Sequence, residues 1–178
     1  GTRFVFLPGP KDPGAQTLPR PPLSGYLTAD LAREVPGVIM GTNPCRMRHF
    51  GRDLVFFRHD VLRLLRRHEA VPLRDPDTGE APSAQQARQE MVRFLLDQAH
   101  LVPLPLEESN VLWAFDHTLR LYPLPHAVFV GGVGQPFDCT YQESRFCSVG
   151  PFSGDSSFYA YYPGSEQLES CDVPDRAG

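Results

Sequence analysis

The strongest constraint on the fold is one short, uninterrupted apolar run, AVFVGG at residues 127–132. A strand with water on one face alternates apolar and polar side chains, whereas this run contains no polar residue. Such a run is typical of a strand that is covered on both faces. The other segments must therefore supply a covering layer on each side of a sheet.

Further strands are predicted on both sides of this run along the chain. The opening stretch RFVFLPGPKDPG, residues 3–14, begins as a hydrophobic strand and runs into Pro-Gly. Apolar and aromatic runs bounded by turn-forming residues indicate the others. These segments are 38–42, 45–50 and 54–58 before the run and 138–142, 145–150 and 157–163 after it.

Two helices are predicted between the early and the late strands. Asp60 is placed to cap the first, whose buried side carries Val61, Leu62, Leu64 and Leu65. Ser83 and Gln86 have the spacing of a capping box. The helix that they open should end near Ala99–His100, with Ala87, Met91, Phe94, Leu95 and Gln98 at helical spacing. Helices early and strands late, around buried strands, predict an α/β sandwich.

The remaining segments lack a regular pattern. Residues 8–25, rich in proline and glycine, are expected to form a loop along the domain, and the polar residues 71–82 a second loop. Residues 103–125 are expected to be extended segments rather than a long helix. The acidic tail, residues 164–178, is expected to be weakly structured.

Composition excludes some classes of function. The formal net charge is −4, without the basic excess that phosphate-binding proteins carry. Arg63, Arg66 and Arg67 are a local exception, interpreted as a solvated helix face, with a partner or phosphate-backbone contact as the alternative. No apolar run is long enough for a membrane span, and the first residues lack the pattern of a secretory signal, so an intracellular protein is expected. The four cysteines, without CxxC spacing, are interpreted as reduced thiols.

The sequence motifs that could form a catalytic, metal or phosphate site give only weak evidence for one. The six histidines, His49, His59, His68, His100, His117 and His126, form no short-range ligand pair, although a long-range cluster stays open. Adjacent Asp116 and His117 point apart on a strand and lack a nucleophile, so a structural role is favoured. VFVGGVGQP follows a strand but Pro136 leads into another strand, which favours a tight turn over a phosphate loop.

Several longer motifs carry a family resemblance, in the same order and over nearly the whole chain. FVFLPGPKDPG, LPRPPL, TNPCR, HLVPLPL, WAFDHTLRLYPLP and VGPFS resemble the B-type accessory subunits of eukaryotic DNA polymerases, and among these the subunits of polymerase epsilon. The wider family is similar to calcineurin-like phosphoesterases, which are two-sheet sandwiches flanked by helices. The resemblance implies that residues 1–178 are the C-terminal part of an inactive domain of this kind.

The same resemblance implies that the metal site is lost. Pro10 and Lys11 stand where active relatives have the Asn and His of Gly-Asn-His-Asp, although Asp12 remains. Arg58 and His59 align near a strand-end His-Gly, and Gly131 to Gly134 replace Gly-His-x-His, so that Gly132 and Gly134 supply no imidazole. The degenerate metal positions are thus Pro10, Lys11, Arg58, His59, Gly132 and Gly134, with no catalytic residue, metal or cofactor expected.

By resemblance, the chain is expected to be a non-enzymatic scaffold in the nucleus. It would bind the C-terminal, zinc-containing region of the polymerase epsilon catalytic subunit and join it to the replicative helicase assembly in DNA replication and repair. DNA would be contacted mainly through the complex, and no membrane is involved; the interface residues are not identified. The alternatives are a metal-dependent phosphoesterase with a displaced cluster around Asp12, His59 and His126, or a direct DNA-binding module.

Overall fold

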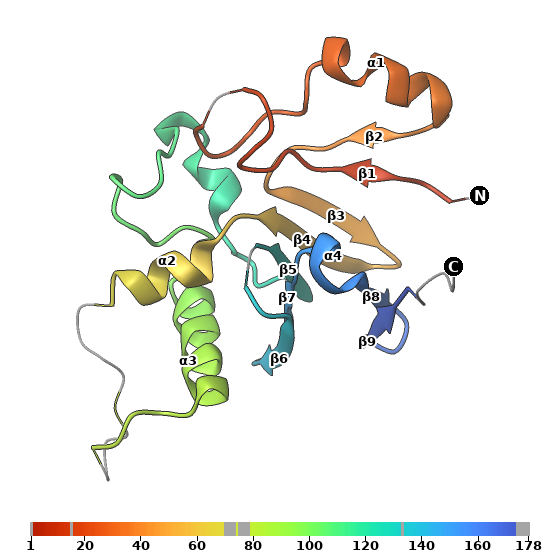
Figure 1. Ribbon diagram of the computed structural model, residues 1–178. Helices are drawn as coiled ribbons and strands as arrows, with labels where there is room; N and C mark the ends of the chain where they lie inside the picture. The colour runs from red at the N-terminus through yellow and green to blue at the C-terminus, as the bar shows by residue number, and fades with distance from the viewer. Residues whose placement is uncertain (1, 15, 70–73, 75–78, 133, 174–178) are drawn as a thin grey trace.

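The protein is built around a five-stranded mixed sheet (Figure 1). The computed structural model describes residues 2–14, 16–69, 74, 79–132 and 134–173. The strand order is β3-β4-β5-β7-β6; the strands are β3 (Cys45–His49), β4 (Arg52–Arg58), β5 (Ala127–Gly131), β6 (Phe137–Tyr141) and β7 (Ser144–Val149). β4, β5 and β7 are parallel, and the two outer strands are antiparallel to their neighbours.

The predicted strands of this sheet are confirmed, and so is the α/β fold class. The apolar run lies in β5, where the side chains of residues 127–130 are buried. In register, Leu54 of β4 pairs with Ala127, and Ala127 pairs with Arg145 of β7. The run therefore forms the middle strand of the sheet, covered on both faces as its composition requires.

One face of the sheet, called here the helix face, packs against two helices. These are α2 (Val61–Arg67) and α3 (Ala84–Asp97). Val55, Phe57, Val128, Val130 and Phe146 point to this side and join a buried cluster with Val61, Val92, Leu95, Leu96, Leu101, Leu119 and Leu121. The cluster also includes residues of the segment that follows α3, so the helices and this segment together cover the helix face.

The opposite face, called here the hairpin face, is covered by β8 (Ser157–Tyr162) and β9 (Gln167–Asp172), which pair antiparallel. Leu54, Ala127, Phe129 and Cys147 are buried here, against the partly buried Phe56, Val149, Tyr159, Tyr161 and Leu168. Figure 1 shows α2 and α3 on one side of the central strands and β8 and β9 on the other. Side chains alternate between the two faces along each strand, as the pleat requires.

The N-terminal part forms a smaller layer. β1 (Val5–Phe6) pairs in parallel with β2 (Ile39–Met40), and α1 (Gly25–Glu34) lies between them in the chain (Figure 1). The predicted strands at 3–14 and 38–42 are confirmed, but only as two-residue strands. α1 was not expected.

The sequence-based prediction of the helices is confirmed in type and corrected in detail. Ser83 and Gln86 form the reciprocal capping box, and α3 ends at Asp97 with Gln98 as C-cap. Asp60 occupies the N-cap of α2, but its side chain makes no capping hydrogen bond. Of the residues noted at helical spacing, Leu95 is fully buried, whereas Phe94 is 46% exposed.

Two predictions about irregular segments are wrong. Residues 103–125 are not all extended, because Trp113–Leu119 form a 3-10 helix, η1. The tail contains β9, which is ordered by pairing with β8. A short helix, α4 (Phe152–Asp155), precedes β8. Of the predicted loop 71–82, residues 71–73 and 75–78 lie outside the described residues, and Arg74 and residues 79–82 are in no helix or strand.

Among the helices that the structure describes, none has both the length and the apolar character needed to cross a membrane.

Candidate site at the carboxyl ends of the parallel strands

The candidate site lies where β4 and β5 end. Because these strands are parallel, their carboxyl ends meet at one edge of the sheet, and Arg58 pairs in register with Gly131. In open α/β sheets this edge is where ligands bind. His59 and Gly132 are the next residues of the two segments, so the topology brings two of the sequence-predicted positions together.

A tight turn from Gly9 to Asp12 closes over this edge. The Gly9 N–H donates to Asp12 Oδ2 at 2.6 Å, and the Asp12 N–H donates to the Gly9 carbonyl oxygen at 3.1 Å. A Cβ at residue 9 would collide with the Arg58 guanidinium, which therefore lies directly against the turn. Arg58 Nη1 is 3.6 Å from Asp12 Oδ2. A side chain at residue 9 would have to push Arg58 away.

Asn43 fixes the position of Arg58. Its side chain is fully buried, accepts from the Arg58 N–H at 2.9 Å and donates to the Arg58 carbonyl oxygen at 2.8 Å. The backbones of Asn43 and Arg20 exchange two hydrogen bonds, at 2.7 and 3.0 Å. Arg20 Nη1 in turn donates to the Gly9 carbonyl oxygen. The proline-rich loop, the turn and the end of β4 are thus joined into one hydrogen-bonded unit.

A cavity of about 270 Å³ opens between these segments. Arg20, Asn43, Arg58 and His59 line it from one side, and the other lining residues are Pro10, Gln16, Leu18, Glu107, Glu108, Ser109 and Asn110. The cavity is therefore lined by two guanidinium groups and an imidazole at the sheet edge.

His59 is held as a neutral imidazole. Its ring stacks on Phe57 with centroids 5.4 Å apart, and Nε2 is 3.4 Å from Ser109 Oγ. Burial lowers the pKa of His59 below its ordinary value, and the charges of Arg20 and Arg63 lower it further, against an opposing effect of Asp60. At neutral pH His59 is thus uncharged, and it can donate or accept a hydrogen bond depending on the tautomer.

The structure brings most of the sequence-predicted positions together. Pro10 lines the cavity beside Arg58 and His59. A Cβ at Gly132 would lie 2.7 Å from Asp60 Oδ1, so any side chain there must displace this carboxylate. Gly134 faces open space, and Lys11 is exposed and does not line the cavity.

Sequence reasoning missed Arg20 and Asn43 as members of the site. Arg20 sits among prolines in LPRPPL, within a loop expected to lie along the surface, yet it is only 5% exposed. An arginine held between prolines beside a turn was the available signal. Asn43 belongs to TNPCR, whose resemblance was noted without a role for this residue.

The alternative metal cluster around Asp12, His59 and His126 is wrong, because His126 lies at the opposite end of β4 and β5 from His59. His126 precedes β5, and its Nδ1 accepts from the Asp53 N–H at 3.0 Å near the start of β4, whereas His59 follows the end of that strand. In the part of the chain that the structure describes, no group of three His, Cys, Asp or Glu side chains is arranged to hold a metal ion.

The remaining motifs have structural partners. Asp116 accepts from Arg120 and lies 3.1 Å from His100 Nε2, so its partner is not His117. The segment after β5 leads into β6 at Phe137, which is a strand and not the helix that a phosphate loop would open. Arg63 lies 3.4 Å from Asp60, and Arg66 and Arg67 are exposed at the end of α2.

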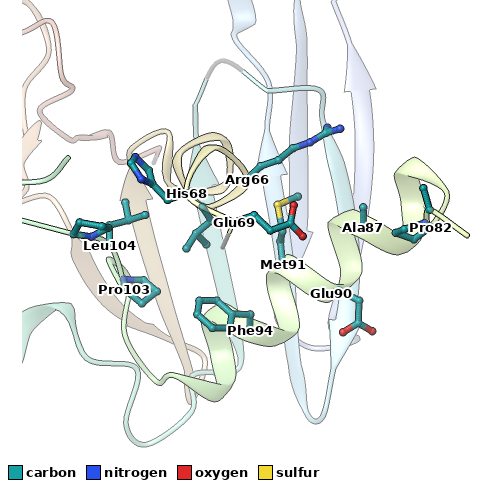
Figure 2. A pocket seen from close by; sticks show the side chains of 13 residues that line it. Arg66, His68, Glu69, Pro82, Ala87, Glu90, Met91, Phe94, Pro103 and Leu104 are labelled. Carbon is teal, nitrogen blue, oxygen red and sulfur yellow. The ribbon is translucent and has the colours of Figure 1, made fainter. Parts of the chain in front are cut away.

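A second, larger hollow lies between α2 and α3. This groove of about 630 Å³ is lined by Leu65, Arg66, His68, Glu69, Ala81, Pro82, Ala87, Glu90, Met91, Phe94, Pro103, Leu104 and Pro105. Figure 2 shows these side chains coming from the end of α2, from the segment just before α3, from α3 itself and from the segment after it. Met91 and the half-exposed Phe94 make its floor largely apolar.

Fold and site together define an α/β protein in which arginine, proline and glycine occupy the strand-end edge where such folds bind ligands. Residues 1–139 match the family described as the B subunit of DNA polymerases alpha and epsilon, and the chain belongs to this family. The resemblance expected from the motifs is confirmed.

Curated relatives carry polymerase epsilon names. The chain is 37% identical over 169 residues to the B subunit of DNA polymerase epsilon from Arabidopsis thaliana, covering 94% of the chain and 31% of that protein. It is 35% identical to "DNA polymerase epsilon subunit 2" of Mus musculus and of Homo sapiens, with the same coverage. The chain thus spans about a third of the length of these relatives.

Proposed function

We propose that this chain is part of a non-catalytic accessory subunit of DNA polymerase epsilon. The observation that carries the proposal is the family match over residues 1–139, together with relatives named as polymerase epsilon subunits. In this proposal the chain binds the C-terminal, zinc-containing region of the catalytic subunit and supports chromosomal replication and repair in the nucleus, where the complex meets the replicative helicase assembly.

The strand-end edge supports a role without catalysis. Pro10 has no side-chain donor atom for a metal, and an imidazole at residue 132 would require Asp60 to move. Two guanidinium groups, of Arg20 and Arg58, line the cavity in which a phosphoesterase would concentrate divalent cations. These positive charges repel a divalent cation, which supports the proposal that this edge holds no metal pair although Glu107 and Glu108 also line the cavity.

Contact with DNA is assigned mainly to the assembled complex. The net charge of −4 gives no overall attraction for a phosphate backbone. Arg66 and Arg67 are exposed at the end of α2, and Arg66 lines the same groove as Glu69 and Glu90. Direct binding of DNA by this chain is therefore the second candidate, recognised by an affinity that falls steeply with salt.

Co-purification tests the proposal. The full chain is co-expressed with the C-terminal region of a polymerase epsilon catalytic subunit, and the retained partner is quantified after a high-salt wash. Retention in equal amounts supports the proposal. A folded chain, verified by its cooperative unfolding, that retains none of the partner contradicts it.

Exposed aromatic residues allow the interface to be located in the same assay. Trp113 on η1 is 69% exposed, and Phe50 at the β3–β4 turn is 81% exposed. Tryptophan and other large aromatics are enriched among the residues that dominate binding energy. Trp113→Ala and Phe50→Ala change surfaces on different elements, so loss of retention by one variant and not the other assigns the contact.

A further inference from the structure

α3 carries a second apolar stripe that faces away from the core. The core side of the helix includes Val92 and Leu95, which are fully buried. Met91 and Phe94 each precede one of these residues by one position, so they are rotated by about 100° around the helix axis. With Ala87 they stand at positions i, i+4 and i+7, which lie on one side of a helix. These three residues are called here the outer stripe.

The outer stripe lines the groove of about 630 Å³ between α2 and α3. Figure 2 shows its three side chains in order along α3. Neither Met91 nor Phe94 belongs to the buried cluster of the helix face or of the hairpin face, and Phe94 is 46% exposed. A surface helix that packs only on its own core carries one apolar stripe. The second stripe therefore indicates a second packing partner for α3.

The groove suits a helix better than an extended segment. Side chains spaced by three and four positions form the ridges that interlock with those of a neighbouring helix. An extended segment would instead need free backbone groups with which to pair. The backbones of α2 and α3 are hydrogen-bonded within the helices, and Pro82, Pro103 and Pro105 at the groove have no N–H to donate. The lining thus offers mainly side-chain contacts.

The charged residues at the groove favour an acidic side chain on its occupant, near the end of α2. His68 and Glu90 have partners within the chain, at 2.8 and 3.8 Å, and Glu69 also has an interaction partner. Arg66 is exposed, and no ion pair among the described residues includes it. Its guanidinium can therefore pair with a carboxylate of the occupant at the rim of the groove.

We propose that this groove binds an amphipathic helix of the catalytic subunit's C-terminal region, with an acidic side chain of that helix facing Arg66. The inference rests on the proposed function, because the occupant belongs to the partner proposed there. With about 630 Å³, the groove has more than twice the volume of the strand-end cavity of about 270 Å³. Methionine and aromatic side chains are enriched in the cores of protein interfaces, and Met91 and Phe94 supply both kinds.

A titration of the full chain with the purified C-terminal region of the catalytic subunit tests the groove. Phe94→Glu should raise the Kd by about tenfold or more at both low and high salt, because it places a charge on the apolar floor. Phe158→Glu is the matched control. Phe158 lies on β8, on the other side of the central sheet, and is 44% exposed. This variant should bind as tightly as the wild type.

Charge reversal on α2 tests the contact at the rim. Arg66→Glu should raise the Kd by about fivefold at low salt and by less at high salt, because salt screens exposed charges. Arg67→Glu changes the net charge by the same amount at an exposed residue that is not among those lining the groove, and its effect should be smaller. Equal effects of the two reversals would assign the change to overall charge and overturn the pairing with Arg66.

The outcomes separate this inference from the proposed function. If the wild type binds and Phe94→Glu binds equally well, the groove is not the contact, although the proposed function stands. If the folded wild type binds none of the partner, both are overturned. The Tm of isolated Phe94→Glu should stay within about 5 °C of the wild type, since the ring is half exposed. A larger fall would show that Phe94 packs on the chain itself, which also overturns the groove as a docking site.

Discussion

The helix face and the hairpin face of the central sheet use the same three parallel strands in different ways. On the helix face, Val55, Val128 and Phe146 are almost completely buried within a cluster that includes two helices and the segment after them. On the hairpin face, the buried set is Leu54, Ala127, Phe129 and Cys147, and the cover is a single two-stranded ribbon. A two-stranded ribbon is only marginally stable by itself, so its order depends on packing against the sheet.

Because of this difference, the two halves of the core need not open at the same denaturant concentration. The helix face buries large side chains from many elements, so a local opening there would expose much apolar surface. The hairpin face can open by moving β8 and β9 alone. Sub-global openings of this kind follow the units with the fewest buried contacts.

Cysteine labelling should give the largest effect, because the buried thiol of Cys147 lies on the hairpin face and the half-buried thiol of Cys139 lies beside the helix-face cluster. Burial raises the pKa of Cys147 on the hairpin face to about 12 and that of Cys139, beside the helix-face cluster, to about 11. At about pH 8 native Cys147, which is buried, should react far more slowly than the half-buried Cys171 on β9, since the accessible thiolate is the reactive species.

Urea below the unfolding midpoint then separates the faces. The labelling rate of Cys147 should begin to rise at a lower urea concentration than that of Cys139, as measured by mass spectrometry of the labelled peptides. If both thiols become reactive together, the two faces open in one transition and the comparison fails.

Matched phenylalanine substitutions should give the next largest effect. Phe146→Ala, at a fully buried helix-face position, should reduce the free energy of unfolding by about 3–5 kcal/mol in urea denaturation. Phe129→Ala, on the hairpin face of the neighbouring strand, should cost about 1 kcal/mol less, because the ribbon can move to reduce the cavity. Equal losses would show that the hairpin is held as firmly as the helices.

Acid should weaken the helix face through His59, whose ring extends this face by stacking on Phe57. The folded pKa of His59 lies below the ordinary value of 6.5, mainly because of burial. Below about pH 6.5 the unfolded chain therefore binds more protons than the folded chain. The stability contributed by neutral His59 decreases as the pH falls from about 6.5 to the folded pKa. His59→Gln should show a flatter decline of the free energy of unfolding between about pH 7 and 5. A decline as steep as that of the wild type would contradict this assignment.

The smallest effect is expected from Tyr161→Phe on the hairpin face. The Tyr161 hydroxyl is buried and has no hydrogen-bond partner, whereas its ring packs edge-on against Phe129 with centroids 5.5 Å apart. Removing the hydroxyl should leave stability unchanged or raise it by about 1 kcal/mol or less, measured as a change in Tm. A clear loss of stability would mean that the hydroxyl has a partner in solution.

The strands of the central sheet could be predicted because their information is local. Continuous apolar runs bounded by turn residues mark β4 and β5, and the capping box marks the start of α3. α1 has no such mark, since Thr28 is its one buried residue. β9, with the sequence QLESCD, has little apolar pattern and is ordered by its partner strand.

The site could be predicted only in part, for a related reason. Resemblance placed Pro10, Arg58, His59 and Gly132 at one degenerate centre, and the parallel strands bring them to one edge. The burial of Arg20 depends on backbone pairing with Asn43, a contact between distant segments that no spacing reveals. That the degenerate positions have lost metal binding stays a prediction, for metal titration of the purified protein to examine.

The parallel pairing of β4 with β5 sets the order in which the chain can fold during synthesis. β4 can pair with β3 as soon as their two-residue turn has formed, but Leu54 must wait for Ala127. At about 5–20 residues per second, the second edge of β4 stays unpaired for roughly 4–15 s. During this interval VFF of β4 is an apolar strand with an open edge, which is the kind of segment that molecular chaperones protect and that aggregates when left exposed. The yield of this protein in a cell-free translation reaction should therefore depend on added chaperones more than that of a helical protein of equal length.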